Sequence, residues 1–138
     1  MKPATSAGKF ALVFLAGGAV GWVLETVATR EPRFSNAFRG AHVPFLPVYG
    51  FGATAVAAAA PLMEKTSIPV RFVVYASSLS ALELAACATD RAMGDPSWNY
   101  DCDGSQCKSP QGSEGCLSWK HALIWGALGL AVDAMVRR

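Results

Sequence analysis

The chain has 138 residues, which is enough for one domain. Hydrophobic residues make up 52% of it and charged residues only 16%, whereas about 25% of a typical soluble domain is charged. This composition favours a membrane protein over the alternative, a water-soluble four-helix bundle. The net charge of +2 and the lack of long runs of like charge exclude nucleic acid as the expected partner. There is no nucleotide-binding glycine loop, so any ATP-driven activity needs a partner protein.

Four mainly apolar segments each have about the 20 residues that cross a bilayer as a helix. They cover residues 8–29, 43–63, 68–89 and 117–136, and a polar loop spans 90–116. We therefore predict an all-α integral membrane protein with a four-transmembrane-helix bundle. The prediction has a single membrane domain over residues 1–138 and a Cys-containing loop between the third and fourth helices.

The first segment carries an acid, Glu25, on the helix face that also holds Gly17 and Gly21, because residues four apart share a face. Such a glycine pair lets another helix approach closely. A carboxylate at the centre of a bilayer costs roughly 2.5–3.5 kcal/mol on insertion scales. Glu25 is therefore either a hydrogen-bonded end of this packing seam or a binding group for a cation, a proton or a polar headgroup. Lys2 and Lys9 before the apolar run are also typical of a signal peptide, but the acid inside the run favours a retained helix.

The second segment opens with Pro44 and Pro47, which remove backbone donors and favour an extended or kinked entry. We expect the freed carbonyl groups to line a polar pocket with Tyr49. Gly50 and Gly52, followed by many alanines, indicate close packing against other helices.

The third segment carries Glu83 on a face with the small residues Ala76 and Ser80 and with Cys87, which indicates that this face points into the bundle. Arg71 lies near the start of the segment, where its side chain can reach the headgroups. Two acids inside apolar helices suit a cation or a proton. The predicted ligand or ion site consists of Glu25, Tyr49 and Glu83 together with Trp22 or Arg39.

The loop before the fourth segment holds Cys102, Cys107 and Cys116. We predict a disulfide, either Cys102 with Cys107 or one of these with Cys116, because the loop has little core of its own. Free thiols and a zinc site completed by Asp103 or His121 remain alternatives, although the spacing lacks the close pair of structural zinc sites. A disulfide places the loop outside and both termini in the cytoplasm, whereas the positive charges are evenly divided between the two sides.

A series of motifs along the chain resembles one family. These motifs are Gly21-Trp22-x2-Glu25, Pro44-Phe45-x-Pro47-x-Tyr49-Gly50-Phe51-Gly52, Glu83, Trp98-x-Tyr100, Gly115 and Trp125-Gly126. Over about residues 10–136 the chain is similar to the ABC-transporter type IV family of CmpB-like small bacterial membrane proteins and to their transmembrane protein 229-like relatives. The resemblance implies a four-helix protein of the bacterial inner membrane. Asn99 and Lys120 stand where the family usually has acids, so any shared ion or proton site lacks two carboxylates here.

We expect a transport-associated function, as a permease-like subunit or a small channel with its polar intramembrane site at Glu25 and Glu83. The alternative is a non-catalytic accessory or scaffold subunit of a larger membrane complex. A membrane thiol oxidoreductase is less favoured, because such chemistry usually needs a close reactive cysteine pair. We predict no enzymatic activity, cofactor or metal. The expected partners are the lipid bilayer and either a second copy of the chain or another membrane protein.

Overall fold

The computed structural model describes residues 6–29, 34–38, 41–44, 46–92 and 115–138, and only the backbone of residues 6, 25, 28–29, 34–38, 41–44 and 46–47. Its helices are α1 (Ser6–Thr29), α2 (Leu46–Ala59), α3 (Ile68–Ala92) and α4 (Trp119–Val136), and the short 3-10 helix η1 (Ala60–Met63) continues α2. The four helices coincide closely with the four predicted segments. The predicted all-α fold is thereby confirmed for the described part of the chain, apart from one short β-hairpin.

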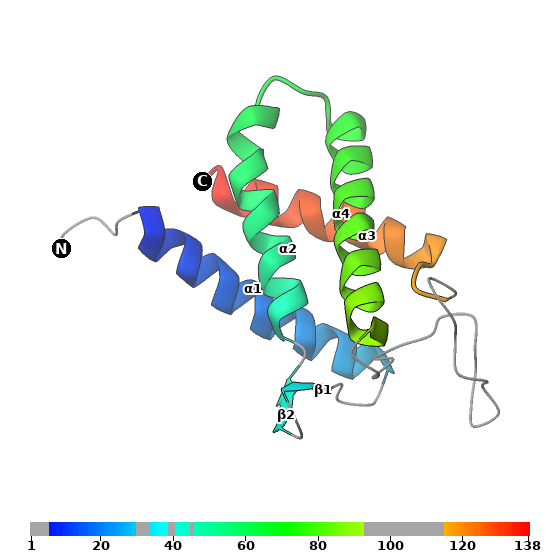
Figure 1. Ribbon diagram of the computed structural model, residues 1–138. Helices are drawn as coiled ribbons and strands as arrows, with labels where there is room; N and C mark the ends of the chain where they lie inside the picture. Colours follow the sequence, from blue (N-terminus) through cyan, green and yellow to red (C-terminus); the bar gives the residue numbers. More distant parts are fainter. Residues whose placement is uncertain (1–5, 30–33, 39–40, 45, 93–114) are drawn as a thin grey trace.

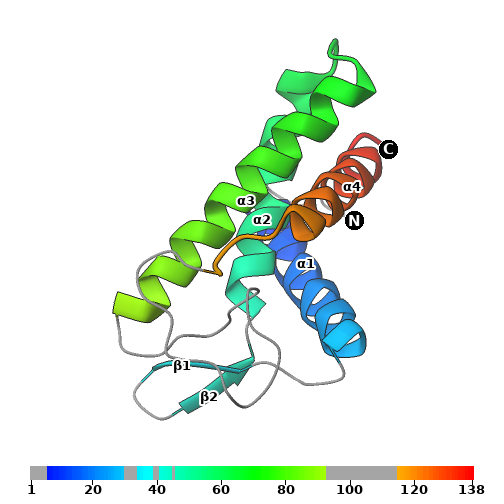
Figure 2. The same cartoon turned by 90° about the vertical axis from the view of Figure 1, so that its right-hand side faces the viewer.

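The helices form two packed pairs (Figure 1). α1 packs against α2, and α4 packs against α3, with further contacts of α2 to both α3 and α4. α2 and α3 run in opposite directions and are joined by a short turn, so that they form a helical hairpin (Figure 1). In the side view α1 and α4 both lie on the same side of this hairpin (Figure 2). The middle of α2 and of α3 therefore faces the other helices.

A small β-hairpin precedes α2, where the sequence predicted an apolar helical segment from residue 43 with an extended or kinked entry but no strand pairing. Strands β1 (Phe34–Phe38) and β2 (Ala41–Pro44) pair antiparallel. Their register places Phe34 opposite Pro44, Ser35 opposite Val43 and Phe38 opposite Ala41. The two prolines explain the difference, because proline has no backbone donor for a helix interior but fits a strand end or the first turn of a helix. Pro44 accordingly ends β2, and Pro47 lies in the first turn of α2.

Two of the described helices are long and apolar enough to cross a membrane. These spans are Ala7–Leu24, with mean hydropathy 1.7, and Ile68–Ala92, with mean hydropathy 1.5; the apolar stretch Val48–Met63 is shorter. Only 6% of the first span and 22% of the second is buried, whereas the core helix of a soluble domain is mostly buried. The span near the N-terminus also has the length and hydropathy of a signal sequence. Four transmembrane helices therefore remain a prediction.

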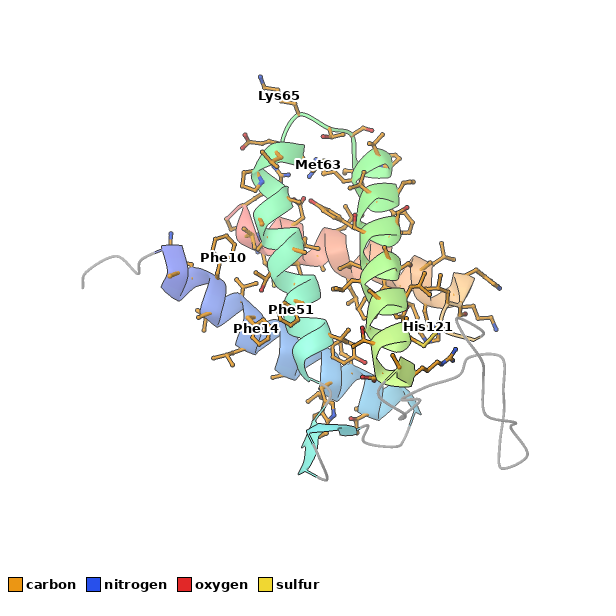
Figure 3. All side chains as sticks on the ribbon, viewed as in Figure 1. Phe10, Phe14, Phe51, Met63, Lys65 and His121 are labelled. Carbon is orange, nitrogen blue, oxygen red and sulfur yellow. A yellow bond between two sulfur atoms is a disulfide. The ribbon has the colours of Figure 1, made fainter. Side chains whose placement is uncertain are left out.

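Small residues set the distance between α1 and α2. A Cβ atom added to Gly21 would lie 2.5 Å from the Tyr49 ring, and one added to Gly50 would lie 2.8 Å from the carbonyl oxygen of Phe14. A Cβ atom on Gly17 would collide with the side chain of Ala53. Beside this contact the rings of Phe14 and Phe51 meet edge to face at 5.1 Å (Figure 3). No larger side chain fits at these three glycines without moving one of the helices.

The same principle applies to α3 and α4. A Cβ atom on Gly126 would lie 2.6 Å from the Phe72 ring, and one on Gly129 would lie 2.5 Å from the Cβ atom of Tyr75. Gly52 of α2 faces α3 with more room, 3.1 Å from Leu79. The close approach of α4 to α3 brings polar side chains of the two helices within hydrogen-bonding distance.

Candidate functional site

Glu83 is a buried acid in the middle of the contact between α3 and α4. Only 5% of its surface is exposed. Trp125 of α4 donates a hydrogen bond from its indole Nε1 to Oε2 of Glu83 over 2.9 Å. A buried polar group without any partner would cost about 1–3 kcal/mol, and this bond contributes to offsetting that cost for the carboxyl group.

Tyr49 of α2 completes the site from a third helix. Its ring lies 5.8 Å from the ring of Trp125, at an interplanar angle of 37°. Its other side lies against Gly21 of α1. Glu83 and Tyr49, both predicted site residues, are thus brought together through Trp125, a residue that the sequence analysis noted only within a family motif.

A small cavity lies beside Glu83. Its lining residues are Val48, Gly52, Leu79, Leu82, Glu83 and Trp125. Its volume of about 10 Å³ matches the minimum that a single water molecule needs. The site as described can therefore accommodate a proton and a water molecule, but not a larger ligand unless the helices move.

The remaining predicted site residues are less fully described. Trp22 lies half-buried on α1 next to Gly21. Glu25 lies one turn further along α1, but its side chain is outside the described residues, as is all of Arg39. Their convergence on Glu83 and Tyr49 remains a prediction.

A second polar cluster lies at the end of the α3–α4 pair where α3 begins and α4 ends. Asp133, which is 2% exposed, is its centre. Arg71 donates from Nη1 to Oδ2 of Asp133 over 2.8 Å, and Arg137 donates from Nε to Oδ1 over 2.8 Å. The hydroxyl group of Tyr75 donates to Oδ1 over 2.9 Å. We call Arg71, Tyr75, Asp133 and Arg137 the arginine cluster.

The arginine cluster also holds the backbone of the neighbouring elements. Arg71 donates from Nε to the carbonyl oxygen of Thr66 over 3.0 Å, and Arg137 donates from Nη2 to the carbonyl oxygen of Ala60. It therefore connects η1, the turn after it, α3 and α4. Desolvation lowers the pKa of the Arg137 guanidinium, but its hydrogen bond with Asp133 outweighs this effect, so the pKa is raised and the group stays charged.

The arginine cluster was not predicted from the sequence. Arg71 was expected only to reach the headgroups, and Asp133 had no predicted function. One signal was available: Asp133 is an acid inside the last apolar segment, and Arg71 is a cation at the matching end of the segment before it. Two antiparallel neighbouring helices place such residues side by side.

Cys87 and Cys116 form a disulfide at the opposite end of the α3–α4 pair. Their Cα atoms are 5.8 Å apart, and both residues are buried. The predicted alternative in which Cys116 pairs with Cys102 or Cys107 was wrong, because Cys116 pairs with Cys87 on α3. A bond between Cys102 and Cys107 stays a prediction. Cys102 and Cys107 lie outside the described residues. Among the residues that the structure describes, no group of three potential ligands can hold a metal ion.

Comparison with known proteins identifies the family. The family model described as "Putative ABC-transporter type IV" matches residues 12–138. The chain belongs to this family. No curated protein and no solved structure matches the chain.

In this member of the type IV family, the matched region contains both polar clusters and both cysteines of the disulfide. The two clusters differ in what they can do chemically. Asp133 is neutralised by two cations, whereas the described contacts of Glu83 include a neutral indole donor and a cavity of about one water.

Proposed function

We propose that this chain is a multi-pass integral membrane protein with a transport-associated function, as a permease-like subunit or a small channel. Its polar intramembrane site is Glu83 with Trp125 and Tyr49. The observation that carries the proposal is a buried carboxyl group, 5% exposed, between two apolar helices and bonded to Trp125. Acids at such positions are expensive in a bilayer and usually mark ion or proton paths. The family name adds a connection with ABC transporters.

The position of Glu83 along α3 supports this assignment. Arg71 and Asp90 lie near the two ends of the helix, separated by roughly 28 Å at 1.5 Å per residue. That distance is close to the thickness of the hydrocarbon core, about 30 Å. Glu83 lies about 18 Å from Arg71 on the same scale, so a bilayer-spanning α3 would hold it within the hydrocarbon region.

A proton or a small cation fits the site best. An indole N–H donates a stronger hydrogen bond to an ionised carboxylate than to a neutral carboxyl group. Protonation of Glu83 would therefore weaken its bond to Trp125 and loosen the contact between α3 and α4 at this depth. Glu25 on α1 is the proposed second acid of the path.

Flux through reconstituted vesicles tests the proposal. The purified full chain is placed in vesicles with a trapped pH-sensitive dye, and proton and potassium fluxes are followed after a gradient is imposed. We expect Glu83→Gln to abolish the flux of the wild-type chain, since the amide fills the same space but cannot ionise. Glu25→Gln should have the same effect if both acids line one path.

Glu64→Gln is the matched control, because it makes the same chemical change at an exposed residue on the turn after η1. It should leave the flux unchanged. Normal flux in Glu83→Gln, in a variant with an unchanged melting temperature, would exclude this acid from transport. Absence of the wild-type chain from the membrane fraction would overturn the membrane assignment itself.

An accessory or scaffold subunit of a larger membrane complex is the second candidate. The observation that favours it is the outer face of α1, where Leu12, Leu15 and Val27 are 68%, 67% and 71% exposed. α1 packs mainly against α2, so this face is available to another membrane helix. The small volume beside Glu83 also fits a subunit that needs partners to form a path.

Site-specific photo-crosslinking separates the two candidates. A photoreactive residue at position 15, on the outer face of α1, should give a crosslink to a single different membrane protein if the chain is an accessory subunit. The matched control is position 73 on α3, where Val73 is also exposed. Crosslinks only between copies of the chain, or only to lipid, would contradict the accessory function.

Neither candidate is an enzyme. The two cysteines among the described residues, Cys87 and Cys116, are buried in a disulfide and lie 29 positions apart in the sequence. Thiol oxidoreductases usually present a close and accessible pair. We therefore assign the disulfide to structure and propose no catalytic residue.

A further inference from the structure

We infer that the arginine cluster binds the phosphate group of an anionic phospholipid. Arg71 and Arg137 supply the donors, at the end of the molecule where α3 begins and α4 ends. This inference rests on the proposed membrane location, but not on the transport function of Glu83.

Arg71 and Arg137 keep N–H donors that their contacts within the protein do not use. Each guanidinium group carries five N–H donors. Within the described residues, Arg71 uses one for Asp133 and one for Thr66, and Arg137 uses one for Asp133 and one for Ala60. Both side chains are partly exposed, at 19% and 22%. Arg137 also has a side-chain hydrogen bond with Tyr75. Three donors on Arg71 and two on Arg137 are thus available to a ligand that approaches from outside the bundle.

The arginine cluster also carries an excess positive charge. Asp133 carries one negative charge and contacts two cations, so the arginine cluster has a net charge of +1. One arginine would be enough to neutralise the acid, and an excess cation in a partly buried position is unfavourable unless an anion lies beside it. Lys65 extends from the turn between α2 and α3 (Figure 3), and Arg138 follows Arg137, so the basic character continues beyond the cluster. Glu64 is the one acid that the same turn adds.

The arginine cluster also lies at the depth of the headgroups and on the cytoplasmic side of the membrane. Arg71 is in the first turn of α3, at the level where an apolar span meets the headgroups. The disulfide between Cys87 and Cys116 lies near the other end of α3 and indicates an oxidising compartment there. The arginine cluster therefore faces the cytoplasmic leaflet, whose lipids carry negative charge. An arginine pair with free donors at this level matches the phosphate of an anionic headgroup.

Lipid nanodiscs test the inference on the full chain. One set contains phosphatidylcholine only, and the other contains phosphatidylcholine and phosphatidylglycerol in equal parts. We expect the wild-type chain to melt at a higher temperature in the second set and to retain phosphatidylglycerol in native mass spectrometry. Arg71→Gln leaves a neutral pair of Asp133 and Arg137, and we expect it to bind phosphatidylglycerol roughly fivefold or more weakly.

Lys65→Gln provides a variant outside the cluster's own hydrogen bonds, so it keeps the test valid if Arg71→Gln does not fold. We expect a smaller loss of binding in this variant. The matched control is Lys120→Gln, which removes an exposed lysine at the opposite end of α4 and should change nothing. Equal melting temperatures of the wild-type chain in the two sets would overturn the inference, as would undiminished lipid retention in both Arg71→Gln and Lys65→Gln.

Inorganic phosphate, added to discs of phosphatidylcholine alone, distinguishes the source of the phosphate group. No shift in melting temperature supports the lipid, whereas a shift as large as that with phosphatidylglycerol would overturn the lipid as the ligand. Insertion into the discs and lipid preference are measured separately, so failure of the membrane location can be distinguished from failure of this inference. A wild-type chain that does not insert into discs refutes the membrane location, whereas an inserted chain without lipid preference refutes this inference only.

Discussion

The two ends of the α3–α4 pair differ from its middle in how the helices are held together. At one end Asp133 joins Arg71, Tyr75 and Arg137, and at the other end a disulfide joins α3 to the segment before α4. Between these ends Trp125 donates a hydrogen bond to Glu83. Strong connections at both ends leave the middle free to change without separation of the helices.

The energies of these contacts support a division of tasks. Removal of one partner from a buried ion pair typically costs about 3–5 kcal/mol, and loss of a disulfide about 2–4 kcal/mol. A single hydrogen bond contributes only about 0.5–1.5 kcal/mol. The contacts at the two ends of the α3–α4 pair are therefore suited to stability. The weaker contact in the middle is suited to Glu83 as a group whose protonation can change.

Asp133→Ala should have the largest effect on stability. It leaves Arg71 and Arg137 without their shared anion in a partly buried position, so we expect the free energy of unfolding to fall by about 3–5 kcal/mol. The measurement is unfolding by a denaturing detergent, followed by circular dichroism. Glu64→Ala, on the exposed turn after η1, is the control and should have little effect. A loss below about 1 kcal/mol would show that the cluster behaves like a surface ion pair.

The disulfide should rank second. The double variant Cys87→Ser and Cys116→Ser loses a crosslink between residues 29 positions apart, for which we expect a loss of about 2–4 kcal/mol. The same measurement on the wild-type chain with and without a reductant gives an independent value. The reductant should not affect the double variant. If it lowers the stability of that variant as well, other cysteines carry part of the effect.

The helices were predictable from the sequence because their signal is local. Long apolar segments indicated four helices, and the small residues around Glu83 indicated correctly that it faces the bundle. The β-hairpin before α2 was missed, although Pro44 and Pro47 already favoured an extended entry. The backbone preferences of two prolines were visible, but the pairing of the strands depends on residues that come together only in the fold.

The contacts between helices were not predictable in the same way. Arg71 and Asp133 are 62 residues apart, and Trp125 and Glu83 are 42 apart. Their meeting requires that α3 and α4 be neighbours, a fact that no short stretch of sequence contains. The cysteine pair shows the same limit, because a shared loop suggested Cys102 or Cys107 as the partner of Cys116, whereas the fold brings Cys87 to it.

Trp125→Phe should have the smallest effect on stability, and it tests the middle directly. Phenylalanine keeps an aromatic ring against Tyr49 but removes the indole donor, so we expect a loss of about 1 kcal/mol. A double-mutant cycle with Glu83→Gln isolates the coupling between the two side chains. If the coupling is this small while Glu83→Gln abolishes flux, the hydrogen bond tunes the acid rather than holding the helices. A loss as large as that of Asp133→Ala would instead make the middle a third structural connection, and the acid would then be expected in any stable packing of α3 on α4, whether or not the protein transports anything.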